Sequence, residues 1–239
     1  MATAKTTTTP GTAVAVKKST NIVSIQDALR AQAAAMSDRI APPSGNMIRV
    51  TQDKKFILPD GTKTEGPLDL VIVDFVSRNE FYMGEYDPNA ISPPACFAIS
   101  PNPKALTPSD NSPEKQAETC AECPMNVFGS KGNGKACKNT RLMAVLPPDA
   151  DEDTPIWLLK TSPTAIKGFD AYVGSVQRTF QMPPIGVVTS VAFDEAQTYA
   201  TLTFSDARPN EQISSHFSRQ AEATTMLMAE PDVSQYGQA

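Results

Sequence analysis

The sequence predicts a mainly β or α+β domain, and three features of its composition and pattern support this fold class. Of the 239 residues, 40% are hydrophobic, which is enough for a sizeable core. The 21 prolines are nearly twice the usual share of about 5%, and prolines in such numbers interrupt long helices and central strands. Short apolar runs bounded by turn residues recur along the chain, as they do in strands. The sequence therefore disfavours a helical bundle or a coiled coil.

Composition and turn residues divide the chain into four segments. Ser24 is a candidate helix N-cap, and Pro42-Pro43 ends the apolar pattern that follows it. The first residues are rich in Thr and lack the apolar core of a secretory leader, and no run is long enough to cross a membrane, so a cytoplasmic protein is expected. We expect a disordered arm at 1–20, an N-terminal helix and linker at 21–44, a single strand-rich domain at 45–210 and a C-terminal helix or tail at 211–239.

Within the domain, apolar runs between turn signals predict strands at 47–58, 68–76, 80–86, 141–146, 156–161, 185–193 and 198–204. Ser162-Pro163 starts one amphipathic helix, which Pro183-Pro184 ends, and six prolines within residues 92–114 predict a long loop. Short strands around one or two helices fit a small barrel of the oligonucleotide-binding type, and they also fit several α+β sheets. We expect the barrel, with flexible termini.

The four cysteines are the most informative residues, and their spacing is C-x23-C-x2-C-x13-C. In a reducing compartment such thiols bind metal more often than they form disulfides. Cys120 and Cys123 are spaced to place two thiolates on one ion, and Cys96 and Cys137 would complete a tetrahedral all-thiolate site. Because protein would then fill every position around Zn²⁺, the ion would be structural and would hold a loop module at 92–141 in place.

Two other interpretations of the cysteines stay open. An iron–sulfur cluster also accepts four cysteine ligands, and a disulfide would use two of them. A free cysteine is also a small hydrophobic residue that is often simply buried. We take structural Zn²⁺ as the expectation.

A basic strip within the module predicts contacts with phosphate. Residues 131–141 carry four positive charges and no acid, although the whole chain has a net charge of −5. The four cationic residues are Lys131, Lys135, Lys138 and Arg141. A local patch of this kind on an acidic protein is typical of a phosphate-binding surface. The alternative is a solvated loop whose lysines only balance the thiolates.

Two further clusters are second-rank candidates for the same role. Lys54, Lys55 and Phe56 form a basic-aromatic cluster, and Tyr82 lies on a predicted strand. An exposed aromatic ring on such a strand can stack on bases, although core packing is the commoner fate of any single aromatic side chain.

No catalytic motif is present in the sequence. The phosphate-binding loop, dinucleotide-binding, nucleophile-elbow and zinc-protease patterns are all missing, so we expect no enzyme. His216 is the single histidine, and its polar surroundings predict a surface or helix-side position.

Several motifs resemble a cysteine module of bacteriophage-encoded proteins. They are Pro93-Pro94-Ala95-Cys96, Cys120-Ala-Glu-Cys123-Pro124-Met-Asn126, Phe128-Gly129-Ser130 and Gly134-Lys135-Ala136-Cys137-Lys138. Residues 158–173 and 187–204 also resemble those proteins, which are uncharacterised or are regarded as candidate single-stranded DNA-binding proteins. Zinc-containing phage single-stranded DNA-binding proteins on an oligonucleotide-binding barrel are the nearest well-understood class. This chain differs from that class because it lacks a strongly acidic C-terminal tail.

The resemblance and the residues together lead to one expected function. It is non-sequence-specific binding of single-stranded DNA that supports phage DNA replication or recombination in the host cytoplasm, in contact with replication or recombination proteins. The alternative is a zinc-stabilised phage protein that binds a polymerase or a virion component without contacting nucleic acid.

Overall fold

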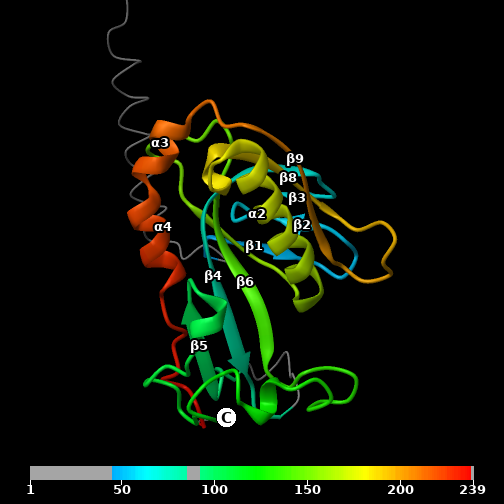
Figure 1. Cartoon of the computed structure of the whole chain (residues 1–239), viewed down its shortest axis with the longest axis vertical. Coiled ribbons are helices and arrows are strands. Elements are labelled where there is room, and N and C mark those ends of the chain that lie inside the picture. The colour runs from blue at the N-terminus through cyan, green and yellow to red at the C-terminus, as the bar shows by residue number, and fades with distance from the viewer. Residues whose placement is uncertain (1–44, 85–91, 238–239) are drawn as a thin grey trace, which may run out of the picture. The chain divides into compact units, whose positions relative to one another are not determined.

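The structure is a computed structural model that describes residues 45–84 and 92–237 (Figure 1). These residues belong to one compact unit, Pro42–Ala239. The expected disordered arm at 1–20 and the expected helix and linker at 21–44 lie outside the described residues, as does part of the strand expected at 80–86.

A single sheet organises the unit, and in the described residues it has nine strands. They are β1 (Met47–Val50), β2 (Phe56–Ile57), β3 (Lys63–Thr64), β4 (Leu68–Phe81), β5 (Cys96–Ser100), β6 (Lys138–Leu146), β7 (Trp157–Lys160), β8 (Val187–Phe193) and β9 (Leu202–Pro209). Their spatial order is β3-β2-β1-β7-β6-β4-β8-β9, and β5 pairs with β4 outside this path. The pairing of β1 with β7 is parallel. The mainly β or α+β class is confirmed.

Helices and short 3-10 turns connect the strands. The helices of the described residues are α2 (Ile166–Phe180), α3 (Ile213–Ser218) and α4 (Gln220–Leu227). The 3-10 turns are η1 (Pro103–Ala105), η2 (Pro124–Asn126), η3 (Pro163–Ala165) and η4 (Pro184–Gly186). The amphipathic helix that the sequence predicts after Ser162-Pro163 is α2. Its last turn closes with Gln181 in the left-handed conformation.

The sheet curls so that side chains from strands near its two ends come into contact. The ring of Phe56 on β2 stacks on the ring of Phe193 on β8, with centroids 4.4 Å apart. Beside this stack, Lys54 Nζ donates a hydrogen bond of 3.0 Å to the carbonyl oxygen of Asp194. Because β2 and β8 stand near opposite ends of the strand order, these contacts define an open half-barrel.

Two cores lie on the two faces of this sheet. On the concave face Phe169 of α2 is fully buried, and its ring meets Phe75 and Phe204 edge-on with centroid distances of 5.0 Å. On the opposite face Ala223 and Leu227 of α4 are buried against β4 and β6. The two helices therefore lie on opposite sides of the central strands (Figure 1).

Tertiary pairing changes several expected strands. The strand expected at 47–58 is two strands, because a turn at 51–55 closes on the Thr51 hydroxyl, which accepts a 3.0 Å hydrogen bond from the Lys55 amide. Residues that were expected to form two strands at 68–76 and 80–86 form the single long strand β4 through Phe81. The proline-rich loop expected at 92–114 contains β5, which pairs with β4.

The C-terminal segment is held by contacts, and the expectation of a flexible C-terminal tail is wrong for the residues that the structure describes. After α4 this segment runs to the loop that follows β5 (Figure 1). Glu230 accepts hydrogen bonds from the side chains of Ser109 and Asn111, and the Tyr236 hydroxyl donates one of 2.7 Å to Glu114. These contacts tie the tail to the loop.

His216 is buried in α3, contrary to the surface position expected from its neighbours in sequence. Its side chain is 1% exposed, and Nδ1 lies 3.0 Å from Nδ2 of Asn210. The same amide nitrogen donates to the carbonyl oxygen of Ile185. Because an amide nitrogen is a donor, Nδ1 accepts and the imidazole is neutral. Burial lowers the pKa of His216, and the nearby charge of Arg219 acts in the same direction.

This burial predicts a stability that depends on pH. Since the pKa of His216 is lower in the folded state, its contribution is fully present above the unfolded value of about 6.5 and is lost as the pH falls below it. The free energy of unfolding of the wild type should fall by up to about 1.4 kcal/mol per pH unit more steeply than that of His216→Gln. Urea titrations between pH 7.5 and 5 would measure this, and parallel curves for the two proteins would contradict it.

Candidate functional site

The register of β4 brings two distant cysteines close together. Cys96 is the first residue of β5 and pairs with Phe81, the last residue of β4. On the other edge of β4, Lys138 of β6 pairs with Glu80, and Cys137 directly precedes it. Cys96 and Cys137 therefore flank the end of the same strand and pack in one cluster with Phe81.

The other two cysteines come from the connection between β5 and β6. The amide of Cys120 donates to the carbonyl oxygen of Leu106, and the carbonyl of Cys123 accepts from the amide of Asn126 across the turn η2. The amide of Cys137 donates a 2.8 Å hydrogen bond to the carbonyl oxygen of Met125, which lies in the turn η2. Backbone hydrogen bonds thus fix the cysteine turn against the start of β6.

All four thiols line one small cavity. Its volume is about 10 Å³, close to that of a single water-sized sphere, and none of the described residues that line it is a histidine or a carboxylate. Burial raises the pKa of the Cys120 thiol and raises that of Cys137 to about 12, and the other thiols of the group add to both shifts. Neighbouring thiolates repel one another, so a bound cation would be needed to stabilise several of them in ionised form.

The donor set fits one soft metal ion. All four cysteines are free thiols, and four thiolates suit Zn²⁺ better than they suit a hard cation. In the described ranges no three His, Cys, Asp or Glu side chains are already arranged to hold a metal ion. Binding would therefore require the thiols to turn further toward their common cavity.

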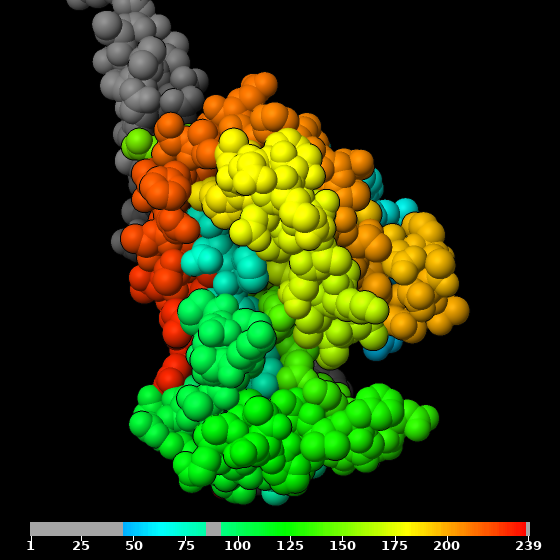
Figure 2. Space-filling model, viewed as in Figure 1, coloured from blue at the N-terminus to red at the C-terminus, as the bar shows by residue number. Residues whose placement is uncertain are grey.

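A larger cleft lies between the loop module at 92–141, called the cysteine module below, and the start of α2. This main cleft has a volume of about 850 Å³, within the range of ligand sites. In Figure 2 it opens between the green cysteine module and the yellow-green start of α2. Among the residues that the structure describes, its lining includes a single carboxylate, Asp170, and six cationic side chains: Lys104, Lys131, Lys135, Lys138, Arg141 and Lys167. On a chain of net charge −5, this concentration of cations is unusual.

Three lysines of the predicted basic strip are exposed in the main cleft. Lys131 lies at a small hairpin that an isolated bridge to Gly134 closes, and Gly132 at its tip has a φ of 57°. Such a positive φ favours glycine. Lys135 Nζ donates a 3.1 Å hydrogen bond to the side-chain oxygen of Asn126. Lys138 is the first residue of β6 and lines the cleft.

Arg141 also lines the cleft, but its guanidinium already has a partner. Its side chain is 10% exposed, and Nε and Nη2 donate to the two carboxylate oxygens of Asp170 at 3.1 and 2.8 Å. This bidentate pair joins β6 to α2. A contact between Arg141 and phosphate, as expected from the sequence, would require displacement of Asp170.

The sequence analysis missed three residues of the cleft. Phe128 lines it with 74% of its surface exposed, and Lys104 and Lys167 contribute two of its cations. Phe128 is followed directly by a stretch rich in Gly, Ser and Lys that contains no apolar residue up to Lys135, and this was a usable signal of exposure. Lys104 and Lys167 lie outside the basic strip, and only the fold brings them to it.

The second-rank candidates do not line the main cleft. Lys55 pairs with Asp53 and Glu65 at 3.5 and 3.6 Å, while Lys54 holds the carbonyl of Asp194. The expectation that Phe56 contacts a ligand is wrong, because its ring is fully buried against Phe193.

Tyr82 follows β4 and is 40% exposed, but it too lies outside the main cleft. Partial burial raises its pKa to about 12, and the negative charge of Glu80 together with a hydrogen bond to that carboxylate adds to the shift.

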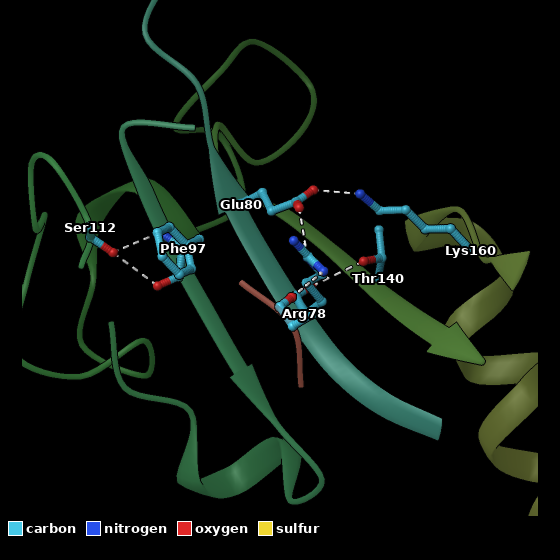
Figure 3. A network of polar contacts seen from close by, with 7 residues as sticks. Arg78, Glu80, Phe97, Ser112, Thr140 and Lys160 are labelled. Carbon is cyan, nitrogen blue, oxygen red and sulfur yellow. Dashed lines mark hydrogen bonds and ion pairs between the residues drawn. The ribbon is translucent and has the colours of Figure 1, made fainter. Parts of the chain in front are cut away.

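Polar contacts at the end of β4 join this strand to β7, and others join the loop after β5 to β5 itself (Figure 3). Glu80 pairs with Arg78 of the same strand at 2.7 Å and with Lys160 of β7. Burial alone would raise the pKa of Glu80, but the charges of Lys160 and Arg78 outweigh it and hold this pKa below its ordinary value. The Ser112 hydroxyl accepts from the Phe97 amide and donates to the Phe97 carbonyl, which ties the loop to β5.

Comparison with protein-family models, curated proteins and solved structures finds no match for this chain. Within the described ranges, no helix combines the length and the apolar character that crossing a membrane requires.

The shared cavity predicts metal content. Purified protein should carry about one Zn²⁺ per chain, and Cys123→Ser should release it and raise hydrogen exchange across residues 92–141, because the metal would hold this loop. Glu122→Ser, a change at the exposed neighbouring residue, is the matched control and should keep the metal. Elemental analysis and hydrogen-exchange mass spectrometry measure both effects. Metal-free, folded wild type with four titratable thiols would contradict the prediction, and strong visible absorbance would indicate an iron–sulfur cluster.

Proposed function

We propose that this chain is a non-enzymatic protein that binds single-stranded DNA in the main cleft. One observation carries the proposal, namely the gathering of six cationic side chains and one carboxylate around a cleft of about 850 Å³ on a chain of net charge −5. A polyanion is the ligand that such a cleft attracts.

The cleft offers separate groups for phosphates and for bases. Lys131, Lys135 and Lys138 are exposed on the cysteine module, and Lys104 and Lys167 face the same space. Ammonium groups on flexible side chains suit phosphates of variable position. Phe128 presents an exposed ring that can stack on a base.

An exposed stacking ring favours a single strand over a duplex, because paired bases already stack on their neighbours. Phosphate contacts and stacking carry no base code, so binding should be largely independent of sequence. The curled sheet belongs to the same broad β class as oligonucleotide-binding barrels. Because Phe169 of α2 is buried on its concave face, the proposed strand lies in the main cleft and not across that face.

In the proposed protein the four cysteines would hold a structural Zn²⁺, which would supply charge neutralisation and a fixed geometry to their turn. The turn leads directly to Phe128 and the basic strip, so the same ion would set the wall of the main cleft. The resemblance to phage cysteine-module proteins is the basis for proposing a role in phage DNA replication or recombination in the host cytoplasm.

The cationic lining predicts a salt-dependent affinity. Each phosphate neutralised on a single strand contributes about 0.7 to the slope of log K against log salt, so replacing Lys131, Lys135 and Lys138 by Ala should flatten this slope by about 2. Fluorescence anisotropy with labelled poly-dT between low and moderate salt measures the slope. In the control variant Ala replaces Lys63 and Arg178, two exposed cations that line neither the main cleft nor the cavity of the thiols. This variant should have the same salt slope as wild type. No wild-type binding at low salt would refute the proposal and favour the alternative of a protein-binding phage factor.

Phe128 predicts a different signature. Phe128→Ala should weaken binding by about 1–3 kcal/mol, the worth of one stacked base, without changing the salt slope. Stability should be unaffected because the ring is 74% exposed. The same titrations measure both quantities, with a thermal melt alongside, and an unchanged affinity would show that no base stacks there.

A further inference from the structure

A second cleft of about 680 Å³ lies where the parallel strands β1 and β7 end. Within the described ranges its lining includes two cations, Arg49 and Lys160, and no acid. Lys160 already pairs with Glu80, whereas Arg49 is exposed. This second cleft therefore continues the positive character of the main cleft onto another part of the sheet.

The two clefts adjoin at the connection between β7 and α2. Residues 160–162 line the second cleft, and Pro163, Thr164 and Ile166 line the main cleft. The border consists of short hydroxyl side chains, because Thr164 contacts the Thr201 hydroxyl and also lies 2.8 Å from that of Ser162. The hydroxyls of Ser162 and Thr164 at this border are able to hydrogen-bond a strand that passes over it.

Tyr199 stands on the wall of the second cleft and is 50% exposed. Its loop is held at both ends, since the amide of Asp194 donates to the carbonyl of Thr201 and Lys54 Nζ caps the carbonyl of Asp194. The side chain of Asp194 also accepts a 2.9 Å hydrogen bond from the amide of Ala196. An exposed ring on an ordered turn is a suitable platform for a base.

We propose that the single strand bound in the main cleft crosses the Ser162–Thr164–Thr201 border and continues into the second cleft. There Tyr199 stacks on a base and Arg49 contacts a phosphate. This inference rests on the proposed function and extends it, because it defines a long footprint with one aromatic platform in each cleft. It also gives Lys54 a role different from the ligand contact expected from sequence, since Lys54 positions the loop that carries Tyr199.

The length of the oligonucleotide distinguishes binding in the main cleft alone from binding across both clefts. Labelled oligo-dT of about 4 and about 16 nucleotides spans the range of site sizes known for oligonucleotide-binding folds. Tyr199→Ala should weaken binding of the longer strand roughly five- to hundredfold, and Arg49→Ala should weaken it and lower its salt slope, while the shorter strand is bound as by wild type. Phe128→Ala should weaken both lengths. Phe217→Ala and Arg178→Ala remove an exposed ring and an exposed cation that line neither cleft, and should change nothing.

A second measurement needs no variant. Photocrosslinking of wild type to a 16-nucleotide strand containing iodouracil, followed by mass spectrometry, should place adducts on both Phe128 and Tyr199. Absence of the Tyr199 adduct, or unchanged binding of the longer strand by Tyr199→Ala and Arg49→Ala, would overturn the extended footprint while the proposed function stands. Failure of wild type to bind either length would overturn both.

Discussion

The main-chain pairing of β4 is the constraint on which the other features depend. Along one edge β4 pairs with β6, and along the other it pairs first with β8 and then with β5. Its first half therefore belongs to the half-barrel and its second half carries the cysteine module. Since side chains alternate between the faces of a strand, a shift of one residue in this register would turn Cys96 and Cys137 away from their shared cavity.

The buried charges at the end of β4 also connect this strand to β7. Glu80 is 5% exposed, and its two partners come from β4 itself and from β7, with which β4 does not pair directly. A buried ion pair contributes little net stability, but removal of one partner would leave a charge without compensation in a dry environment. The pair with Arg78 lies within β4, so only the contact with Lys160 of β7 depends on how β4 and β7 are placed relative to one another. A pairing of β4 that separated Glu80 from Lys160 would lose this contact.

Local signals in the sequence predicted the features that depend on neighbouring residues. The turn at Ser162-Pro163 that leads into α2 and the clustering of the lysines of the basic strip both follow from residues close together in the chain. The burial of Phe56 and the ion pair of Arg141 could not be predicted, because their partners, Phe193 and Asp170, are distant in sequence. The strand β5 was not expected because it lies in a proline-rich segment, and its pairing with β4 makes it a strand. At these positions the structure depends on partners that are distant in sequence.

The same distinction between local and distant effects explains how an acidic chain could hold a polyanion. At physiological ionic strength, charges separated by more than about 8 Å are largely screened in water. In the proposed complex, a phosphate inside the main cleft would therefore be governed by the cations that line it, and the carboxylates elsewhere on the surface would have little effect on it. Because Asp170 neutralises Arg141 at the floor, the attraction comes from lysines on flexible side chains. Such lysine side chains could contact a phosphate at several positions, so the proposed binding would tolerate different base sequences and different registers of the strand. The aromatic rings would then fix the positions of the bases.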